Sequence, residues 1–135
     1  NRPMRFLDVL KDFKVQVMMN AVSYVSRHIY NFEEKVWPEA HRQGVALVAM
    51  KVYGGGVKPQ GGRIKSKDVF EAFRYAQSLP NISTVVVGMY DQKELQENLS
   101  FARTYKPLNS EEFADLVARG KKLSDSWGTP YGPVT

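Results

Sequence analysis

The sequence lacks cysteine altogether, which excludes a disulfide framework, a thiolate nucleophile and any iron–sulfur or zinc site held by cysteines. It also lacks an apolar run approaching the roughly 18–20 residues that a membrane span requires. Acidic residues interrupt the first apolar stretch and no small-residue cleavage site follows it, so it does not resemble a signal peptide. These absences predict a cytoplasmic protein with no membrane partner. Position 1 is asparagine rather than methionine, which indicates a fragment or a processed product.

Positive charge is present but is not concentrated. The net charge is +5 with a pI near 9.5, and the only basic cluster is "RGKK" at residues 119–122. A nucleic-acid protein usually shows a basic stripe and a recognisable module. We see neither and expect no nucleic-acid partner, whereas the positive balance mildly favours anionic ligands such as phosphates.

Apolar runs and helical patterns alternate along the chain. Strands are predicted where valine-rich apolar runs occur, at residues 14–22, 45–50 and 83–89. Helices are predicted from Pro3 to about residue 13, from Asn31 to Gly44, and at residues 66–79, 91–105 and 109–123. N-terminal caps are predicted at Asn31 and Asp91, each with a glutamate three residues later, and at Asn109 or Ser110. Pro38 should kink its helix.

This alternation predicts parallel βα units of an α/β protein. Three strands in 135 residues amount to about half of the roughly 250 residues of a complete (β/α)₈ barrel. A doubly wound sheet that lacks a strand fits the same pattern. No linker divides the chain, so we expect one domain over residues 1–135, with an irregular tail over 124–135.

Three segments together resemble the aldo/keto reductases, and in particular their bacterial and archaeal branch: "VQVMMN", "GVALVAMKVYGGG" and "VVVGMYDQKELQENL". The resemblance runs from about Phe13 to Tyr105. It implies the C-terminal half of a (β/α)₈ TIM barrel, with its last three βα units. The family transfers hydride from NAD(P)H to a carbonyl, so the resemblance implies a nicotinamide dinucleotide and, in the complete protein, a small carbonyl substrate.

The resemblance also implies a set of cofactor-binding residues. Gln16 matches the glutamine that binds the nicotinamide carboxamide, and Met50 stands where many members have a stacking tyrosine. The loop from Lys51 to Gly56 matches the one over the pyrophosphate. Gly54 and Gly55 belong to this loop. Gly88, Met89 and Tyr90 match the family's loop near the adenosine ribose. Glu97 and Asn98 match a Glu-Asn pair that contacts the adenine amine.

Two departures from the family pattern limit what the resemblance implies. Glu94 stands where an arginine often binds the 2′-phosphate of NADP, so the 2′-phosphate preference stays open and NADH is not disfavoured. The family's catalytic residues lie in the half of the barrel that has no counterpart here. We therefore predict no catalytic and no metal-binding residue, and no turnover by the isolated chain.

Other interpretations remain open. Lys51 and Tyr53, two residues apart at the end of a strand, would project to the same side and could form a proton-donating pair. The glycine-rich segment could be a structural loop. The whole chain could be a non-catalytic half-barrel that serves binding or assembly. In any of these cases the outer strands would leave open edges, which we expect to be covered by the missing half of the barrel or by a second copy.

Overall fold

The computed structural model describes residues 2–55 and 63–135. Gly56, which the predicted cofactor loop includes, lies outside the described residues together with residues 57–62. Among the described residues, no helix is both long and apolar enough to cross a membrane.

Three parallel strands form one sheet in the order β1-β2-β3, as predicted. They are β1 (Val17–Ala21), β2 (Ala46–Met50) and β3 (Ile82–Val85). Each is shorter than its apolar run in the sequence. Because β2 lies in the centre, β1 and β3 are the two edge strands among the described residues, in agreement with the expected open edges.

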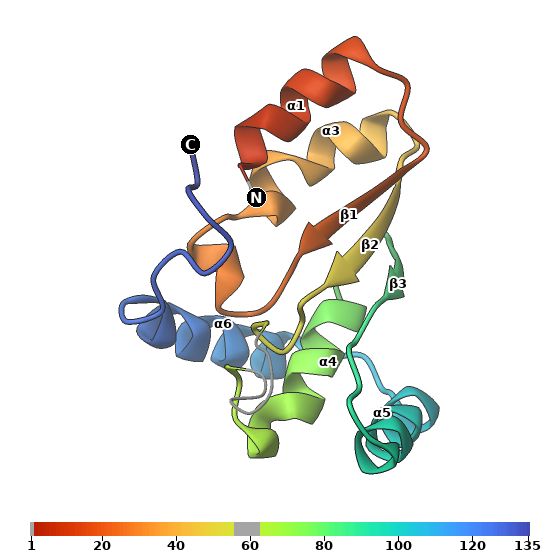
Figure 1. Cartoon of the computed structure of the whole chain (residues 1–135), viewed down its shortest axis with the longest axis vertical. Coiled ribbons are helices and arrows are strands. Elements are labelled where there is room, and N and C mark those ends of the chain that lie inside the picture. Colours follow the sequence, from red (N-terminus) through yellow and green to blue (C-terminus); the bar gives the residue numbers. More distant parts are fainter. Residues whose placement is uncertain (1, 56–62) are drawn as a thin grey trace.

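The helices lie on one side of the sheet and around its carboxyl end (Figure 1). The helix α3 packs against β2, α4 packs against β3, and α6 packs against α4 and the short helix η1. The bounds of the helices are α1 Pro3–Asp12, η1 Ser26–His28, α2 Phe32–Lys35, α3 Trp37–Arg42, η2 Ser66–Asp68, α4 Val69–Gln77, α5 Gln92–Thr104 and α6 Ser110–Ser124. The irregular tail therefore begins at residue 125, one residue later than expected.

The predicted kink at Pro38 is confirmed as a break. Helix α2 ends before Val36, and α3 begins at Trp37 with the proline in its first turn. Proline tolerates this position because it has no N–H to donate, and a first-turn N–H would have no helical partner. Gly44 then follows α3 with φ 72°, a left-handed conformation that glycine adopts without steric cost.

One predicted capping box is wrong. Asn31 adopts φ 53° and makes no cap hydrogen bond to the backbone of α2; its side-chain amide donates instead to the Glu34 carboxylate at 2.8 Å. The cap predicted at Asp91 is confirmed, since its carboxylate accepts the Glu94 N–H at 2.9 Å. At α6 the predicted cap is a complete capping box between Asn109 and Glu112.

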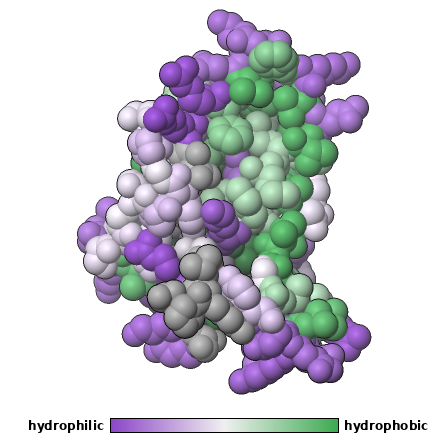
Figure 2. All heavy atoms as spheres, viewed as in Figure 1, coloured by the Kyte–Doolittle hydropathy of each residue, from purple (hydrophilic) through white to green (hydrophobic). Residues whose placement is uncertain are grey.

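The two faces of the sheet differ in their cover. On the helix side, Met18, Leu47 and Ala49 are at most 4 % exposed. On the other side, Val17 is 58 % exposed and Met19 is 45 % exposed. Figure 2 shows hydrophobic side chains gathered along the side of the molecule where the strands lie.

Candidate functional site at the carboxyl ends of β2 and β3

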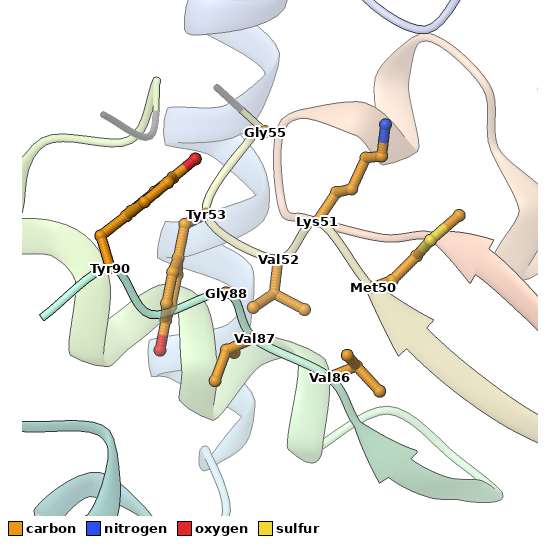
Figure 3. A pocket seen from close by; sticks show the side chains of 9 residues that line it. All are labelled: Met50, Lys51, Val52, Tyr53, Gly55, Val86, Val87, Gly88 and Tyr90. Carbon is orange, nitrogen blue, oxygen red and sulfur yellow. The ribbon is translucent and has the colours of Figure 1, made fainter. Parts of the chain in front are cut away.

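A pocket of about 310 Å³ opens where β2 and β3 end (Figure 3). Its walls come from the two βα loops that follow these strands. Ligands of parallel α/β sheets bind outside the carboxyl ends of the strands, and this pocket has that position. The residues that line it are Met50, Lys51, Val52, Tyr53, Gly55, Val86, Val87, Gly88 and Tyr90.

The loop after β2 turns sharply because of its backbone conformation. Lys51 has φ 56°, and Gly54 and Gly55 have φ 81° and 66°. The Gly54 N–H donates to the Lys51 carbonyl at 2.8 Å, which closes the turn. Left-handed φ is free for glycine but costs a lysine roughly 1 kcal/mol or more, so Lys51 holds a strained conformation at the rim of the pocket.

The expectation that Lys51 and Tyr53 project to the same side is wrong. The strand ends at Met50, and the left-handed Lys51 changes the direction of the chain, so the alternation of a strand no longer applies. Figure 3 shows the Lys51 ammonium and the Tyr53 ring extending away from each other. Their arrangement therefore does not support a proton-donating pair.

Tyr53 instead connects the loop to helix α5. Its hydroxyl donates to the side-chain oxygen of Asn98, and the Asn98 amide donates to the Glu94 carbonyl at 2.7 Å. Burial, followed by the nearby charge of Glu97, raises the pKa of Tyr53 above its ordinary value. The phenol is thus neutral at physiological pH and serves as a donor that fixes the loop against α5.

The loop after β3 supplies the other wall through Gly88 and Tyr90. A Cβ added at Gly88 would meet nothing within 4 Å, and Tyr90 is 53 % exposed. The loop is tied to the start of α5, because the Tyr90 N–H donates to the Glu94 carboxylate at 2.7 Å. This contact fixes a negative charge beside the pocket.

Five of the predicted cofactor residues meet in the pocket: Met50, Lys51, Gly55, Gly88 and Tyr90. Gly54 lies within the same turn, and Asn98 reaches the pocket wall through Tyr53. Met89 and Glu97 do not line the pocket. Met89 is 44 % exposed, and a carboxylate oxygen of Glu97 lies 3.9 Å from the Lys93 ammonium on the surface of α5.

Gln16 is not part of this group, and its predicted convergence with the other residues is wrong. It is exposed and precedes β1, and its carbonyl accepts the N–H of Ala46 at the start of β2. Because the strands are parallel, Gln16 lies at the amino end of the sheet and the pocket lies at the carboxyl end. The sequence run suggested a strand from residue 14, but the observed strand begins only at Val17.

Sequence reasoning did not name Val86 and Val87 as lining residues, and it included Val52 and Tyr53 only as members of the loop from Lys51 to Gly56 and, for Tyr53, as a possible acid. A usable signal was present, since all four lie within three residues of the end of β2 or β3. Among the described residues, no three histidine or acidic side chains are grouped so that they could hold a metal ion.

Solved structures show the same fold. The chain is similar to the aldo-keto reductase AKR11C1 from Bacillus halodurans in its holo form, with a TM-score of 0.61 and 16% identity over 88% of this chain. The apo form of that protein gives a TM-score of 0.62 and 17% identity, again over 88% of this chain. No family model and no curated protein matches the sequence.

The chain covers 47–48% of the length of these reductase structures. The resemblance noted in the sequence is thereby confirmed at the level of the fold: the chain folds as about half of an aldo-keto reductase barrel.

Proposed function

We propose that this chain is the cofactor-binding half of an NAD(P)H-dependent oxidoreductase of the aldo/keto reductase type, which reduces a small carbonyl substrate in the complete protein. The observation that carries the proposal is the pocket formed by the loops after β2 and β3 in a half-barrel. When bound, the cofactor would supply the hydride.

The described residues fit the phosphate and adenosine end of such a cofactor. Lys51 lines the pocket and is exposed, so its positive charge would attract a phosphate. The aromatic rings of Tyr53 and Tyr90 line the same pocket. Met50 offers a polarizable apolar contact there.

The residues fit the nicotinamide end less well. Gln16, the expected partner of the carboxamide, lies at the other end of the sheet. We therefore propose no cofactor role for Gln16, and we assign none to Met89 or Glu97, which lie outside the pocket.

The experiment is a titration of the protein with NADH and NADPH, followed by nicotinamide fluorescence. Replacing Lys51 with methionine should weaken both by about fivefold, because one surface charge contact is worth about 1 kcal/mol. Lys11→Met is the matched control, since Lys11 is an exposed lysine on α1. Absence of binding by the unmodified protein, or equal losses in the two variants, would refute the proposal.

Glu94 allows a second test, of cofactor preference. Its carboxylate would repel a 2′-phosphate, so NADPH should bind no more tightly than NADH. Glu94→Gln keeps an oxygen that can accept the hydrogen bond from the Tyr90 N–H but removes the charge. It should therefore raise the affinity for NADPH, relative to that for NADH, by about fivefold. A tenfold preference of the unmodified protein for NADPH would contradict this assignment.

A second candidate function is a non-catalytic assembly module. It is favoured by the exposed face of the sheet that carries Val17 and Met19, here called the bare face, and by the open edges of the outer strands. Parallel sheets are normally covered on both faces. In this alternative, the missing half of the barrel or a second copy covers the sheet and no dinucleotide binds. The same titration separates the two candidates, because only the first predicts binding that depends on Lys51.

A further inference from the structure

The C-terminal tail, residues 125–135, packs against the glycine turn at the rim of the pocket. A Cβ added to Gly54 would lie 2.7 Å from a ring atom of Trp127, and one added to Gly55 would lie 3.0 Å from a ring atom of Tyr131. Gly54 is thus required by contact as well as by its positive φ, and a side chain at Gly55 would fit only tightly against Tyr131. The tail and the turn are fitted to each other.

Two cations of this region lie over the two aromatic rings of the tail. The Lys51 ammonium lies 4.7 Å from the centroid of the Tyr131 ring, and the Arg63 guanidinium lies 4.3 Å from that of Trp127. Arg63 also donates to the Trp127 carbonyl at 2.7 Å. A cation over an aromatic face is attracted by the electron density of the ring, and the attraction keeps it in place.

The ring that holds Lys51 is itself held firmly. Tyr131 stacks on Tyr30 with the ring centroids 5.4 Å apart, and its N–H donates to the Tyr30 hydroxyl at 2.9 Å. The Tyr30 hydroxyl donates in turn to the Gly132 carbonyl at 3.0 Å, and Tyr30 is fully buried. Burial raises the pKa of Tyr131 to about 12, so its ring carries no charge at neutral pH.

We propose that Tyr131 is a positioning residue, which holds the Lys51 ammonium at the rim of the pocket for an anionic phosphate or pyrophosphate group. The proposal rests on the proposed function, since the phosphate would be that of the dinucleotide. An ammonium has three N–H donors, and a ring on one side leaves donors on the open side for an anion. Holding the long lysine side chain in advance lowers the entropy lost on binding.

The strained backbone of Lys51 agrees with this role. A non-glycine residue with positive φ persists only where its surroundings enforce it, and such residues gather at ligand sites. Here the surroundings are the turn, closed by the Gly54 N–H, and the ring of Tyr131. Together they aim a charged side chain that would otherwise sample many rotamers.

The test measures the affinity of the protein for two probes, inorganic pyrophosphate and NADH. Tyr131→Leu removes the ring face and should weaken the binding of both probes about two- to fivefold. This factor corresponds to the usual strength of an exposed cation–π contact. Tyr131→Phe retains the ring and should stay within about twofold of the unmodified protein.

A double-mutant cycle separates positioning from a merely structural effect. If Tyr131 acts through Lys51, then Tyr131→Leu should cause no further loss in a Lys51→Met background. Equal losses in the two backgrounds would overturn the proposal, and so would tighter binding of pyrophosphate by Tyr131→Leu, since the ring would then be competing with the anion for Lys51.

A measurement without ligand supports the cycle. With lysine labelled by ¹³C at Cε, the Lys51 signal should show a ring-current shift that Tyr131→Leu abolishes and Tyr131→Phe retains. An unchanged Lys51 signal in Tyr131→Leu would overturn the proposal.

The two probes distinguish this proposal from the proposed function. Pyrophosphate binding that depends on Tyr131 and Lys51, without NADH binding, would sustain the positioning role and refute the dinucleotide. An NADH affinity that Tyr131→Leu leaves unchanged would sustain the dinucleotide and refute the positioning role. Failure of both probes to bind would refute both proposals.

Discussion

The two faces of the three-stranded sheet have nearly the same kind of side chains but different surroundings. On the helix side, where α3 packs against β2, Leu47 and Ala49 are completely buried. On the other side, Val17 and Met19 of the edge strand β1 are 58 % and 45 % exposed, whereas Val48 of the central strand, which pairs with Met19, is 8 % exposed. Apolar composition alone therefore does not reveal which face carries the stability of the chain.

This difference shows where the fold is self-sufficient and where it is not. The helix side is a packed interior, and a largely buried ion pair lies beside it, in which an Arg27 guanidinium nitrogen is 3.0 Å from a Glu33 carboxylate oxygen. The bare side has the apolar character of a barrel interior, and among the described residues no second sheet packs across it. Four predictions test the contrast, from the largest expected effect to the smallest.

The largest effect is expected from a cavity on the helix side. Leu47→Ala should lower the free energy of unfolding by about 3 kcal/mol, because it removes a fully buried side chain and leaves a void. Met19→Ala, on the bare face, should cost less than about 1 kcal/mol. Urea unfolding of both variants gives the comparison, and similar losses would mean that the bare face is packed in solution.

The second prediction concerns the buried Glu33, whose carboxylate accepts hydrogen bonds from the Tyr75 hydroxyl at 2.8 and 2.9 Å. Burial raises the pKa of Glu33 to about 7, although Arg27 and Tyr75 oppose the shift. A raised carboxyl pKa means that the folded state binds the proton more tightly than the unfolded state. The resulting stabilisation is full below about pH 4.5 and is lost as the pH rises through about 7.

The expected loss between these pH values is up to about 3 kcal/mol. It should be seen as a falling urea midpoint between pH 4.5 and 7.5, and Glu33→Gln should flatten that profile. A midpoint that rises over the same interval would show that the ion pair with Arg27 outweighs burial.

The third prediction concerns the close approach of α6 to the segment after β1. A Cβ at Gly120 would lie 1.9 Å from the Tyr24 carbonyl oxygen, so Gly120→Ala should force the elements apart and cost about 2 kcal/mol. Gly88→Ala is the control, since its Cβ would meet nothing within 4 Å. Thermal unfolding measures both, and a stabilised Gly120→Ala would show that α6 does not pack as described.

The smallest effect on stability is expected on the bare face, where Met19→Gln should change the free energy of unfolding by less than about 0.5 kcal/mol. It should nevertheless weaken association, because a covering partner would have to bury a polar amide there. Light scattering over a hundredfold concentration range measures this. A monomer at all concentrations, with or without the substitution, would contradict the expectation that a second copy covers the face.

Local signals predicted the elements well, and the tertiary arrangement decided the site. The caps at Asp91 and Asn109, the break at Pro38 and the existence of strand β2 all follow from short-range chemistry. The capping box at Asn31 failed although its residues have the right spacing. There the Asn31 amide bonds the Glu34 side chain, and the left-handed backbone removes the cap geometry.

The candidate cofactor residues did not all come together, and regularity of the backbone does not explain which of them did, since Lys51 and Gly55 line the pocket with a left-handed backbone. Gly88 and Tyr90 follow β3 and line the pocket as expected. Lys51 and Tyr53 separated because one left-handed residue ended the alternation of the strand. Gln16 fell at the wrong end of the sheet because β1 begins only after it.

By itself the sequence determined the parallel βα order, since apolar runs and amphipathic helices alternate and each element carries its own start and stop signals. It also determined the excess of positive charge and the absence of cysteine chemistry. Only the tertiary structure placed Tyr131 over Lys51 and Trp127 against Gly54, which are 80 and 73 positions apart in the chain. Such contacts depend on where the tail returns, and this is decided by packing over the whole molecule rather than by any local pattern.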